Sequence, residues 1–331
     1  MSSRLKLALE ADFLRFGEAG TIGYMNAGGS SDFGGVDAGR IVAQTHIYPT
    51  AQALSVRGVR CVREISEQVS ACIVQCHRSK LATLDLLRRA FELTEPGGLV
   101  ILDGNKTDGV ESALKSVKSR FELDGSYSKA HGKLAWVCRP ETLPDLTSWS
   151  ASPRIVAEEF TTFAGVFSAE KIDTGSQLLA DHLPPLSGRV IDLGAGWGYL
   201  ARRILKNPSV EHLLLADADA LALQAAELNI DDARAEFLWC DARTLAASPA
   251  DVIVSNPPFH AGRVPDPGLG QAFIETSARL LKPKGSLWMV ANRGLPYEET
   301  LNVSFGRVEP VAQTRGFKII HATNPKTARK R

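Results

Sequence analysis

The chain has 331 residues, of which 44% are hydrophobic and 23% are charged, and its formal net charge at pH 7 is +1. This length allows two domains of ordinary size, and the composition is typical of a globular protein. The small net charge excludes a strong overall field that would attract nucleic acid, so any basic surface must be local.

Membrane and secretory segments are not expected. No apolar run approaches the roughly 20 residues of a membrane span, and Met1–Glu10 lacks the pattern of a secretory signal. The five cysteines are odd in number and show no paired spacing, which argues against a disulfide framework or a metal site. We therefore expect a cytoplasmic protein with reduced thiols and no bound metal.

Three segments of residues 1–150 indicate an α/β plan. Ala71–Cys76 is an apolar run, Leu93–Ile101 passes from a helix end through Pro96 and two glycines into a strand, and His131–Trp136 follows a glycine turn. We expect no glycine-rich turn after a strand of this half. Prolines 140, 144 and 153, with several serines and threonines between them, predict the linker to the second half.

Residues 151–331 alternate strands with helices of about ten residues, which predicts βαβ units and a parallel sheet. The expected strands are 189–193, 211–217, 234–240, 251–255 and 286–291, and the expected helices are 197–205, 220–230 and 269–281. Two further strands, 307–313 and 317–322, are joined by Thr314-Arg315-Gly316. They form a hairpin, so the sheet ends in an antiparallel strand.

The two halves match each other at nearly one offset. Gly98 corresponds to Gly285 at an offset of 187, and the hairpin segments correspond at an offset of 184. Ala71–Cys76 corresponds to Asp251–Asn256 at an offset of 180. A repeated helix–Pro–Gly–strand pattern can arise by chance, but three matches at similar offsets favour a duplicated domain.

A stiff corner follows the strand 251–255. Asn256-Pro257-Pro258-Phe259 combines a side-chain amide, two prolines and an aromatic ring. Prolines fix φ and lack an N–H group, so this corner cannot continue a strand and keeps its carbonyls available. It suits a planar group that carries an N–H. The first half has Cys76-His77-Arg78-Ser79 in this position, so only the second half is expected to keep the site.

A glycine-rich turn follows the strand 189–193. Glycines allow positive φ and close approach of a ligand to the backbone. In Gly194-Ala195-Gly196-Trp197-Gly198 the third glycine comes one place too early for the dinucleotide fingerprint. Asp192 precedes the first glycine by two places. Its carboxylate would repel a pyrophosphate and favours a cationic ligand, which argues against a nucleotide-dependent oxidoreductase.

Four polar side chains, Asp192, Asp217, Asp241 and Asn256, end or follow four successive strands. Ligands of open α/β sheets bind at this edge. Asp217 stands where a carboxylate accepts both hydroxyls of a ribose, and Asp241 stands where one meets an adenine amine. Each aspartate alone is more often a cap or turn residue, but the ordered set predicts a ligand site.

With these motifs, the second half resembles a class I S-adenosylmethionine-dependent methyltransferase from about residue 160 to residue 324. Within that class it resembles the bacterial 16S ribosomal RNA guanine-N2 methyltransferases of the small-subunit methyltransferase C family, and their 23S relatives. The closer match is carried by Gly165–Leu179, Ser255–His260, Val290–Tyr297, Phe305–Gly306 and Ala312–Lys318. Trp197 departs from the smaller residues that are usual in the glycine loop.

The resemblance implies a fold of two tandem Rossmann-like methyltransferase domains, each with a mostly parallel sheet that ends in an antiparallel hairpin. Residues 1–150 would form a degenerate domain that docks RNA or aids folding, and residues 151–331 the catalytic domain. The expected cofactor is S-adenosylmethionine, with Asp192, Gly194, Gly196, Asp217, Asp241 and Asn256 as its binding residues. The segment containing Phe167 and Gly175 is expected to close over it.

The implied reaction is methylation of the exocyclic N2 amine of a guanine in 16S ribosomal RNA, free or in the assembled small subunit, by a monomeric enzyme. Asn256 and the Pro257 carbonyl would accept the two amine hydrogens, and Phe259 would stack on the flipped base. Three alternatives stay open: guanine N2 in 23S ribosomal RNA, an adenine amine in nucleic acid, and a protein glutamine amide. Enzymes of the last kind usually carry tyrosine where this chain has Phe259, which favours a nucleic-acid base.

Overall fold

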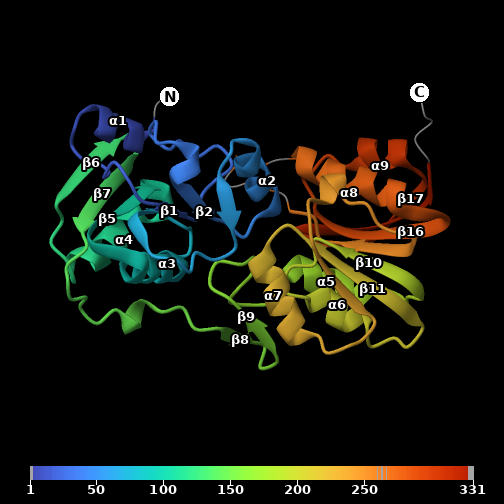
Figure 1. Cartoon of the computed structure of the whole chain (residues 1–331). Coiled ribbons are helices and arrows are strands. Elements are labelled where there is room, and N and C mark those ends of the chain that lie inside the picture. The colour runs from blue at the N-terminus through green and yellow to red at the C-terminus, as the bar shows by residue number, and fades with distance from the viewer. Residues whose placement is uncertain (1–2, 259, 262–263, 266, 327–331) are drawn as a thin grey trace. The chain divides into compact units, whose positions relative to one another are not determined.

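The computed structural model describes residues 3–258, 260–261, 264–265 and 267–326, without the side chains of 260–267 (Figure 1). The chain divides into two compact units, Met1–Pro153 and Arg154–Arg331. None of the described helices is long and apolar enough to cross a membrane. The described residues also contain no group of three or more His, Cys, Asp or Glu that could hold a metal ion.

The first unit is built on a seven-stranded sheet in the order β3-β2-β1-β4-β5-β7-β6. Its strands are β1 (Ile22–Met25), β2 (Ile41–Gln44), β3 (Arg60–Val62), β4 (Val69–Gln75), β5 (Thr94–Asn105), β6 (Gly125–Lys129) and β7 (Gly132–Cys138). Its α-helices are α1 (Arg4–Glu10), α2 (Tyr48–Val56), α3 (Lys80–Leu93) and α4 (Val110–Lys118). Strands β1 to β5 pair in parallel, and β7 is antiparallel to both β5 and β6.

The second unit repeats this sheet in the order β12-β11-β10-β13-β16-β18-β17. Its strands are β10 (Gly188–Leu193), β11 (Val210–Asp217), β12 (Ala235–Trp239), β13 (Ala250–Ser255), β16 (Leu281–Asn292), β17 (Phe305–Gln313) and β18 (Phe317–Pro325). Its helices are α5 (Thr174–His182), α6 (Tyr199–Ile204), α7 (Ala220–Asn229), α8 (Pro267–Leu280) and α9 (Glu298–Ser304). Small hairpins are formed by β8 (Arg154–Val156) with β9 (Phe160–Thr162) and by β14 (His260–Ala261) with β15 (Val264–Pro265).

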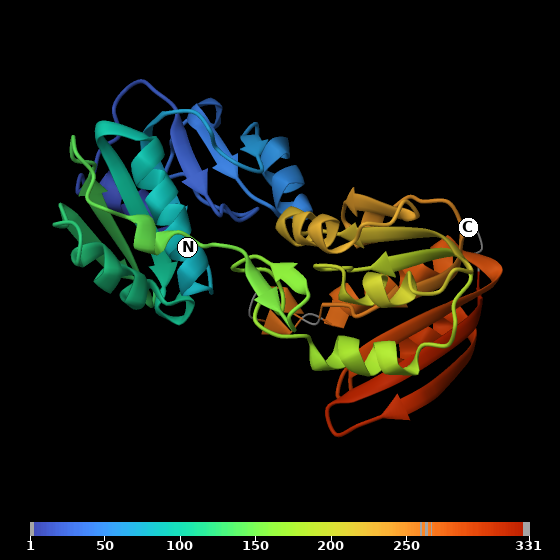
Figure 2. The same cartoon turned by 90° about the horizontal axis from the view of Figure 1, so that it is seen from below.

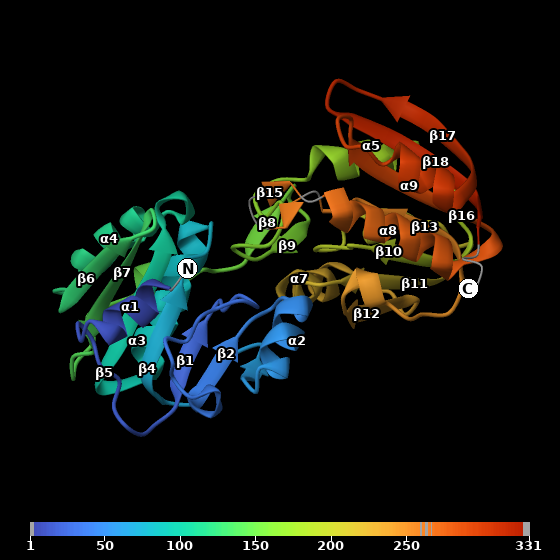
Figure 3. The same ribbon diagram turned by 90° about the horizontal axis from the view of Figure 1, so that it is seen from above.

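Helices cover both faces of the second sheet (Figure 1). Leu179, Leu200 and Leu223 of α5, α6 and α7 pack in the core on one face, and Phe273 and Leu301 of α8 and α9 pack in the core on the other. The hairpin of β17 and β18 forms the end of the sheet, as Figure 2 and Figure 3 show. The central strands are buried on both faces, which explains their nearly continuous apolar sequences.

The predicted duplication of an α/β fold is confirmed by the identical strand orders. Strands β5 and β16 both have 12 residues, and their ends correspond at the offset of 187. The helix expected from Trp197 begins at Tyr199, because Gly198 has a φ of 88° and lies outside the helical region. Helix α9 and the hairpin of β8 and β9 were not predicted.

One expectation about the first half was wrong. Strand β1 is followed by Asn26-Ala27-Gly28-Gly29, so a glycine-containing turn does follow an early strand. The strand has only four residues, and so short an apolar run carries no periodicity that would predict it. The turn nevertheless differs from its counterpart after β10, because neither Gly28 nor Gly29 has a positive φ.

Candidate active site

The glycine loop that follows β10 holds an unusual backbone. Gly194, Gly196 and Gly198 have φ values of 79°, 56° and 88°, which side chains rarely tolerate. A Cβ atom at Gly194 would lie 3.1 Å from the ring of Phe273, whereas one at Gly196 would meet nothing within 4 Å. Gly194 therefore permits close packing, and Gly196 leaves open space beside the loop.

The glycine loop is fastened to the end of β11. The amide of Gly194 donates to the Ala216 carbonyl over 2.8 Å. The amide of Gly196 donates to Asp217 Oδ2 over 2.7 Å, and Asp219 donates its amide to the other carboxylate oxygen over 2.8 Å. Asp217 thus holds the loop against the end of β11. Each of its carboxylate oxygens keeps a further lone pair that could accept a hydrogen bond from a ligand.

Asp192 is a buried carboxylate on β10. Its side chain is 0% exposed, and neither of its oxygens has a hydrogen-bond partner among the described residues. Burial, followed by the nearby charge of Asp217, raises the pKa of Asp192 to about 8. A buried carboxyl group without a hydrogen-bond partner lowers the stability of the fold. It favours a positively charged ligand beside it.

Asp241 caps the turn at Ala242–Thr244. One carboxylate oxygen accepts the amide of Arg243 over 2.9 Å, and the other pairs with the Arg243 guanidinium over 2.6 Å. Burial alone would raise the pKa of Asp241, but the hydrogen bonds from Arg243 outweigh it and the pKa is lowered. The carboxylate therefore has the geometry of a turn cap, and its contact with a cofactor stays a prediction.

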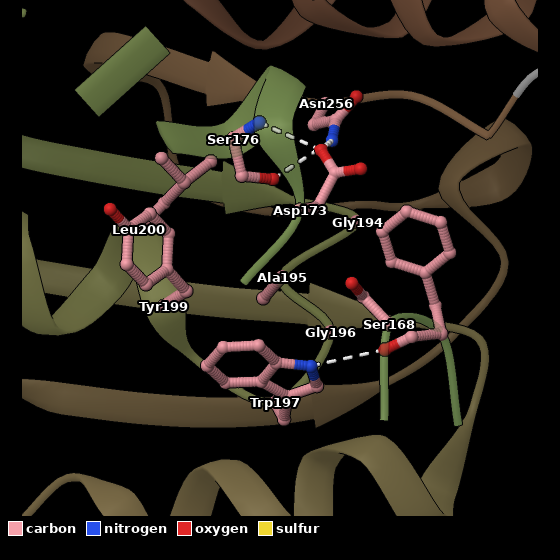
Figure 4. A pocket seen from close by; sticks show the side chains of 11 residues that line it. Ser168, Asp173, Ser176, Gly194, Ala195, Gly196, Trp197, Tyr199, Leu200 and Asn256 are labelled. Carbon is pink, nitrogen blue, oxygen red and sulfur yellow. Dashed lines mark hydrogen bonds between the residues drawn. The ribbon is translucent and has the colours of Figure 1, made fainter. Parts of the chain in front are cut away.

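One pocket joins the glycine loop to the segment before α5 and to the corner after β13 (Figure 4). Gly194, Gly196 and Asn256 line it, whereas Asp192, Asp217 and Asp241 do not. The complete lining is Phe167, Ser168, Asp173, Ser176, Gly194, Ala195, Gly196, Trp197, Tyr199, Leu200 and Asn256. Three of the predicted site residues thus meet in one cavity, and the three aspartates are not part of its lining.

Asn256 begins the corner after β13, where Ser255 ties this strand to β10 by donating its hydroxyl to the Leu193 carbonyl over 2.7 Å. The side-chain nitrogen of Asn256 donates to Asp173 Oδ2 over 2.9 Å and to Ser176 Oγ over 2.8 Å (Figure 4). Its side-chain oxygen accepts no hydrogen bond from the described residues. The pocket therefore receives an amide whose acceptor end is available.

Asp173 and Ser176 were not predicted as site residues. The sequence signals them only as part of the segment Gly165–Leu179 that carries the resemblance, and by the spacing of a helix cap, since Asp173 precedes α5 and accepts the amide of Ser176. Pro257 is buried and Pro258 is exposed. Phe259 lies outside the described residues, so its predicted stacking role is not described by the structure.

Trp197 fastens the segment before α5 to the glycine loop. Its ring is 4% exposed and lies 5.1 Å from Phe160 and 5.9 Å from Tyr199. The indole nitrogen donates to the Phe167 carbonyl over 3.0 Å. A residue as large as tryptophan fits this loop because its ring links the glycine loop to the segment before α5, and both segments line the pocket.

Three comparisons with known proteins agree with this geometry. A family model described as "Methyltransferase small domain" matches residues 157–321. The chain is 31% identical over 258 residues to "Ribosomal RNA small subunit methyltransferase C" of Shewanella oneidensis, covering 75% of each chain. It is 33% identical over 239 residues to the protein of the same name from Shewanella sp. strain MR-4, covering 70% of each.

The chain is also similar to a solved structure described as a T. thermophilus 16S rRNA N2 methyltransferase in complex with AdoMet and guanosine. The TM-score is 0.79 at 21% identity, and the match covers 97% of this chain and 92% of the other. At this identity the likeness shows the fold. The shared fold includes both units, since nearly the whole chain is covered.

Proposed function

We propose that this chain, which belongs to the ribosomal RNA small subunit methyltransferase C family, transfers a methyl group from S-adenosylmethionine to the N2 amine of a guanine in 16S ribosomal RNA. The pocket that joins Gly194 and Gly196 to Asn256 carries the proposal. In this pocket the glycine loop, which could bind a cofactor, lies beside the side-chain oxygen of Asn256, which could accept a hydrogen bond from an amine.

The residues of the second unit fit the expected cofactor. S-adenosylmethionine supplies a methyl group on a positively charged sulfonium. Gly194 and Gly196 would bind it along the loop, where a Cβ atom at Gly196 would meet only open space. Asp192 holds its proton up to about pH 8 when no ligand is bound. A sulfonium beside it would favour the ionised carboxylate, next to Asp217 at the loop. Asp241 would contribute only if its oxygens are shared with Arg243.

Asn256 and Pro257 would activate the amine. The exocyclic amine of guanine is a poor nucleophile because its lone pair is delocalised into the ring. Asn256 Oδ1 would accept one amine hydrogen, and the Pro257 carbonyl would accept the other. These two contacts localise the lone pair on the face that receives the methyl group. Phe259 would stack on the flipped base. Positioning of the reacting atoms then supplies much of the rate, and no general base is assigned.

The first unit would dock the folded RNA or support the second unit. Arg88 and Arg89 are engaged in ion pairs with Asp85, Glu92 and Glu64. Lys115 and Lys118 on α4 are exposed and have no ion pair among the described residues, which makes them the better candidates for phosphate contacts. The proposal also places the chain in the cytoplasm, together with its ribosomal RNA substrate. The chain would act on this RNA as a monomer.

Methylation assays with defined substrates test the proposal. Unmodified small and large subunits, and the free RNAs of each, would be incubated with tritiated S-adenosylmethionine and analysed by nucleoside mass spectrometry. We expect N2-methylguanosine in small-subunit material alone. The same product in large-subunit material, or a methylated protein glutamine, would overturn the proposed substrate.

A further inference from the structure

We infer that Asp173 and Ser176 are positioning residues that fix the polarity of the Asn256 amide, so that the site accepts only a group that donates an N–H. This inference rests on the proposed function, because it concerns how the same pocket selects an amine. It assigns a role to the first turn of α5.

The polarity follows from the chemistry of the partners. A carboxylate accepts hydrogen bonds and donates none. Asp173 Oδ2, which lies 2.9 Å from the Asn256 nitrogen, must therefore face the NH₂ group of the amide and not its oxygen. The second amide hydrogen is taken by Ser176 Oγ over 2.8 Å. Both N–H groups are thereby used, and the oxygen alone can serve the substrate.

The two positioning residues are themselves held firmly. Asp173 Oδ2 also accepts the amide of Ser176 over 2.8 Å, which caps α5. Between them, Gly175 is buried: a Cβ atom there would lie 3.0 Å from Asp173 Oδ2 and 3.1 Å from the ring of Phe317 on β18. The first turn of α5 therefore packs against Phe317 of β18, and the acceptors for Asn256 are preorganised.

This arrangement gives the pocket a basis for discrimination. A reversed amide would lose two hydrogen bonds and would bring its oxygen against the carboxylate of Asp173. A base that presents a carbonyl where guanine presents its amine would meet Asn256 Oδ1 oxygen to oxygen. The structure thus favours an amine over a carbonyl before any contact with the rest of the base is made.

A charge swap between Asp173 and Asn256 tests the inference. Asn256→Asp places two carboxylates together, and we expect kcat on 16S ribosomal RNA to fall about a hundredfold. Asp173→Asn in the same chain supplies an NH₂ group to the new carboxylate and restores the pair with reversed donors. We expect the double variant to be at least about tenfold faster than Asn256→Asp alone.

The matched variants separate positioning from folding. Ser176→Ala should lower kcat about tenfold, whereas Gln177→Ala, at an exposed site on the same helix, should leave kcat unchanged. Calorimetry would show that the Kd for S-adenosylmethionine changes less than kcat in Ser176→Ala. A double variant no faster than Asn256→Asp alone would overturn the inference, because a residue that only supports the fold cannot be rescued by a polarity swap.

A second measurement needs no methylation. The side-chain NH₂ signals of Asn256, assigned by their loss in Asn256→Ala, should be protected from hydrogen exchange in the unliganded protein. Both should exchange at least tenfold faster in Asp173→Ala. Equal exchange in the two proteins would overturn the inference. A failed proposed function would be recognised separately, as an inactive or differently specific wild-type enzyme that still shows the protected amide.

Discussion

The corner after β13 and its counterpart after β4 occupy the same place in two sheets of identical strand order. In the first unit the corner bonds to itself and to its neighbours: Cys76 donates its amide to Asp103, His77 donates to Thr83 Oγ1, and Ser79 donates to His77 Nδ1. Ser79 also caps α3. In the second unit Pro257 and Pro258 have no amide to donate, so a closure of this kind cannot form.

The loops that follow β1 and β10 also differ between the two units, in this case in backbone conformation. Three glycines with positive φ shape the loop after β10, whereas Asn26 alone has a positive φ, of 57°, among residues 26–31 after β1. A Cβ atom at Gly29 would lie 3.1 Å from Ala53, so this glycine serves packing within the unit. The second unit therefore differs from the first in the open space beside Gly196 and in a corner that cannot close on itself.

Buried positions in the two sheets also correspond. With β5 and β16 aligned at the offset of 187, their ladders with β4 and β13 match Ile73 to Val254. Tyr24 pairs with Ile73 and Asp192 pairs with Val254, so Tyr24 stands where Asp192 stands. Tyr24 is 4% exposed, and its hydroxyl donates to Gln75 Oε1 over 3.4 Å. Neither carboxylate oxygen of Asp192 has such a partner among the described residues, so Asp192 is costly to the fold in a way that favours a role in ligand binding.

The largest expected effect separates the two corners. Asn256→Ala should lower methyl transfer about a thousandfold, because the amine loses its acceptor. Binding of S-adenosylmethionine should stay within a few-fold of wild type in calorimetry. Cys76→Ser, in the corner of the first unit, should leave both values unchanged. Comparable activity of Asn256→Ala and wild type, measured by tritiated-methyl incorporation, would remove Asn256 from the mechanism.

The next effect concerns the buried acid of β10. The pKa of Asp192 is about 8 in the folded protein, above its usual value of 3.8. Folding is therefore penalised as pH rises from about 4 to about 8, where the unfolded chain ionises and the folded one does not. Asp192→Asn should remove this penalty, which is of the order of a few kcal/mol at pH 8.

Urea unfolding of Asp192→Asn and wild type at pH 4.5, 6 and 8 measures this difference. We expect the variant to gain stability over wild type steadily across this range. Its affinity for S-adenosylmethionine should be weaker at pH 8, because the negative charge is gone. Parallel stability curves for the two proteins would show that Asp192 does not titrate in this range.

A smaller effect distinguishes the two glycine loops. Gly196→Ala forces a side chain into a φ of 56° and into the open space beside the pocket. We expect a loss of about 1 kcal/mol in stability and about a tenfold rise in the Kd for S-adenosylmethionine. Gly28→Ala lacks the positive φ and has its nearest neighbour at 3.7 Å, so neither quantity should change. Equal affinities of the two variants would contradict a cofactor role for the loop.

The smallest effect tests the role of the first unit. Lys115→Glu with Lys118→Glu on α4 should weaken binding of 16S ribosomal RNA several-fold and lower its salt dependence by about two phosphate contacts. Lys206→Glu, at an exposed site after α6 in the second unit, serves as the control. Fluorescence anisotropy at two salt concentrations measures both. Unchanged RNA affinity in the α4 variant would move the docking surface away from this helix.

The duplicated α/β plan, the glycine loop at Gly194 and Gly196, and the proline corner at Asn256 could all be predicted from the amino-acid sequence. These features are local: strand periodicity, glycine spacing and proline chemistry act within a few residues. Short strands such as β1 were not predicted, because four residues are too few to show a hydrophobic periodicity. The sequence is compatible with a capping role for Asp241. The structure adds that its carboxylate also pairs with the guanidinium of Arg243.

The contacts that hold the site depend on the folded chain. Asp173 and Ser176 reach Asn256 across 83 and 80 residues of chain, and no local pattern encodes a contact of that separation. The burial of Asp192, its correspondence in register to Tyr24, and the closed corner at Cys76 likewise depend on which strands lie side by side. Sequence patterns set the chemistry available at each strand end, and the order of strands in the sheet brought these ends together.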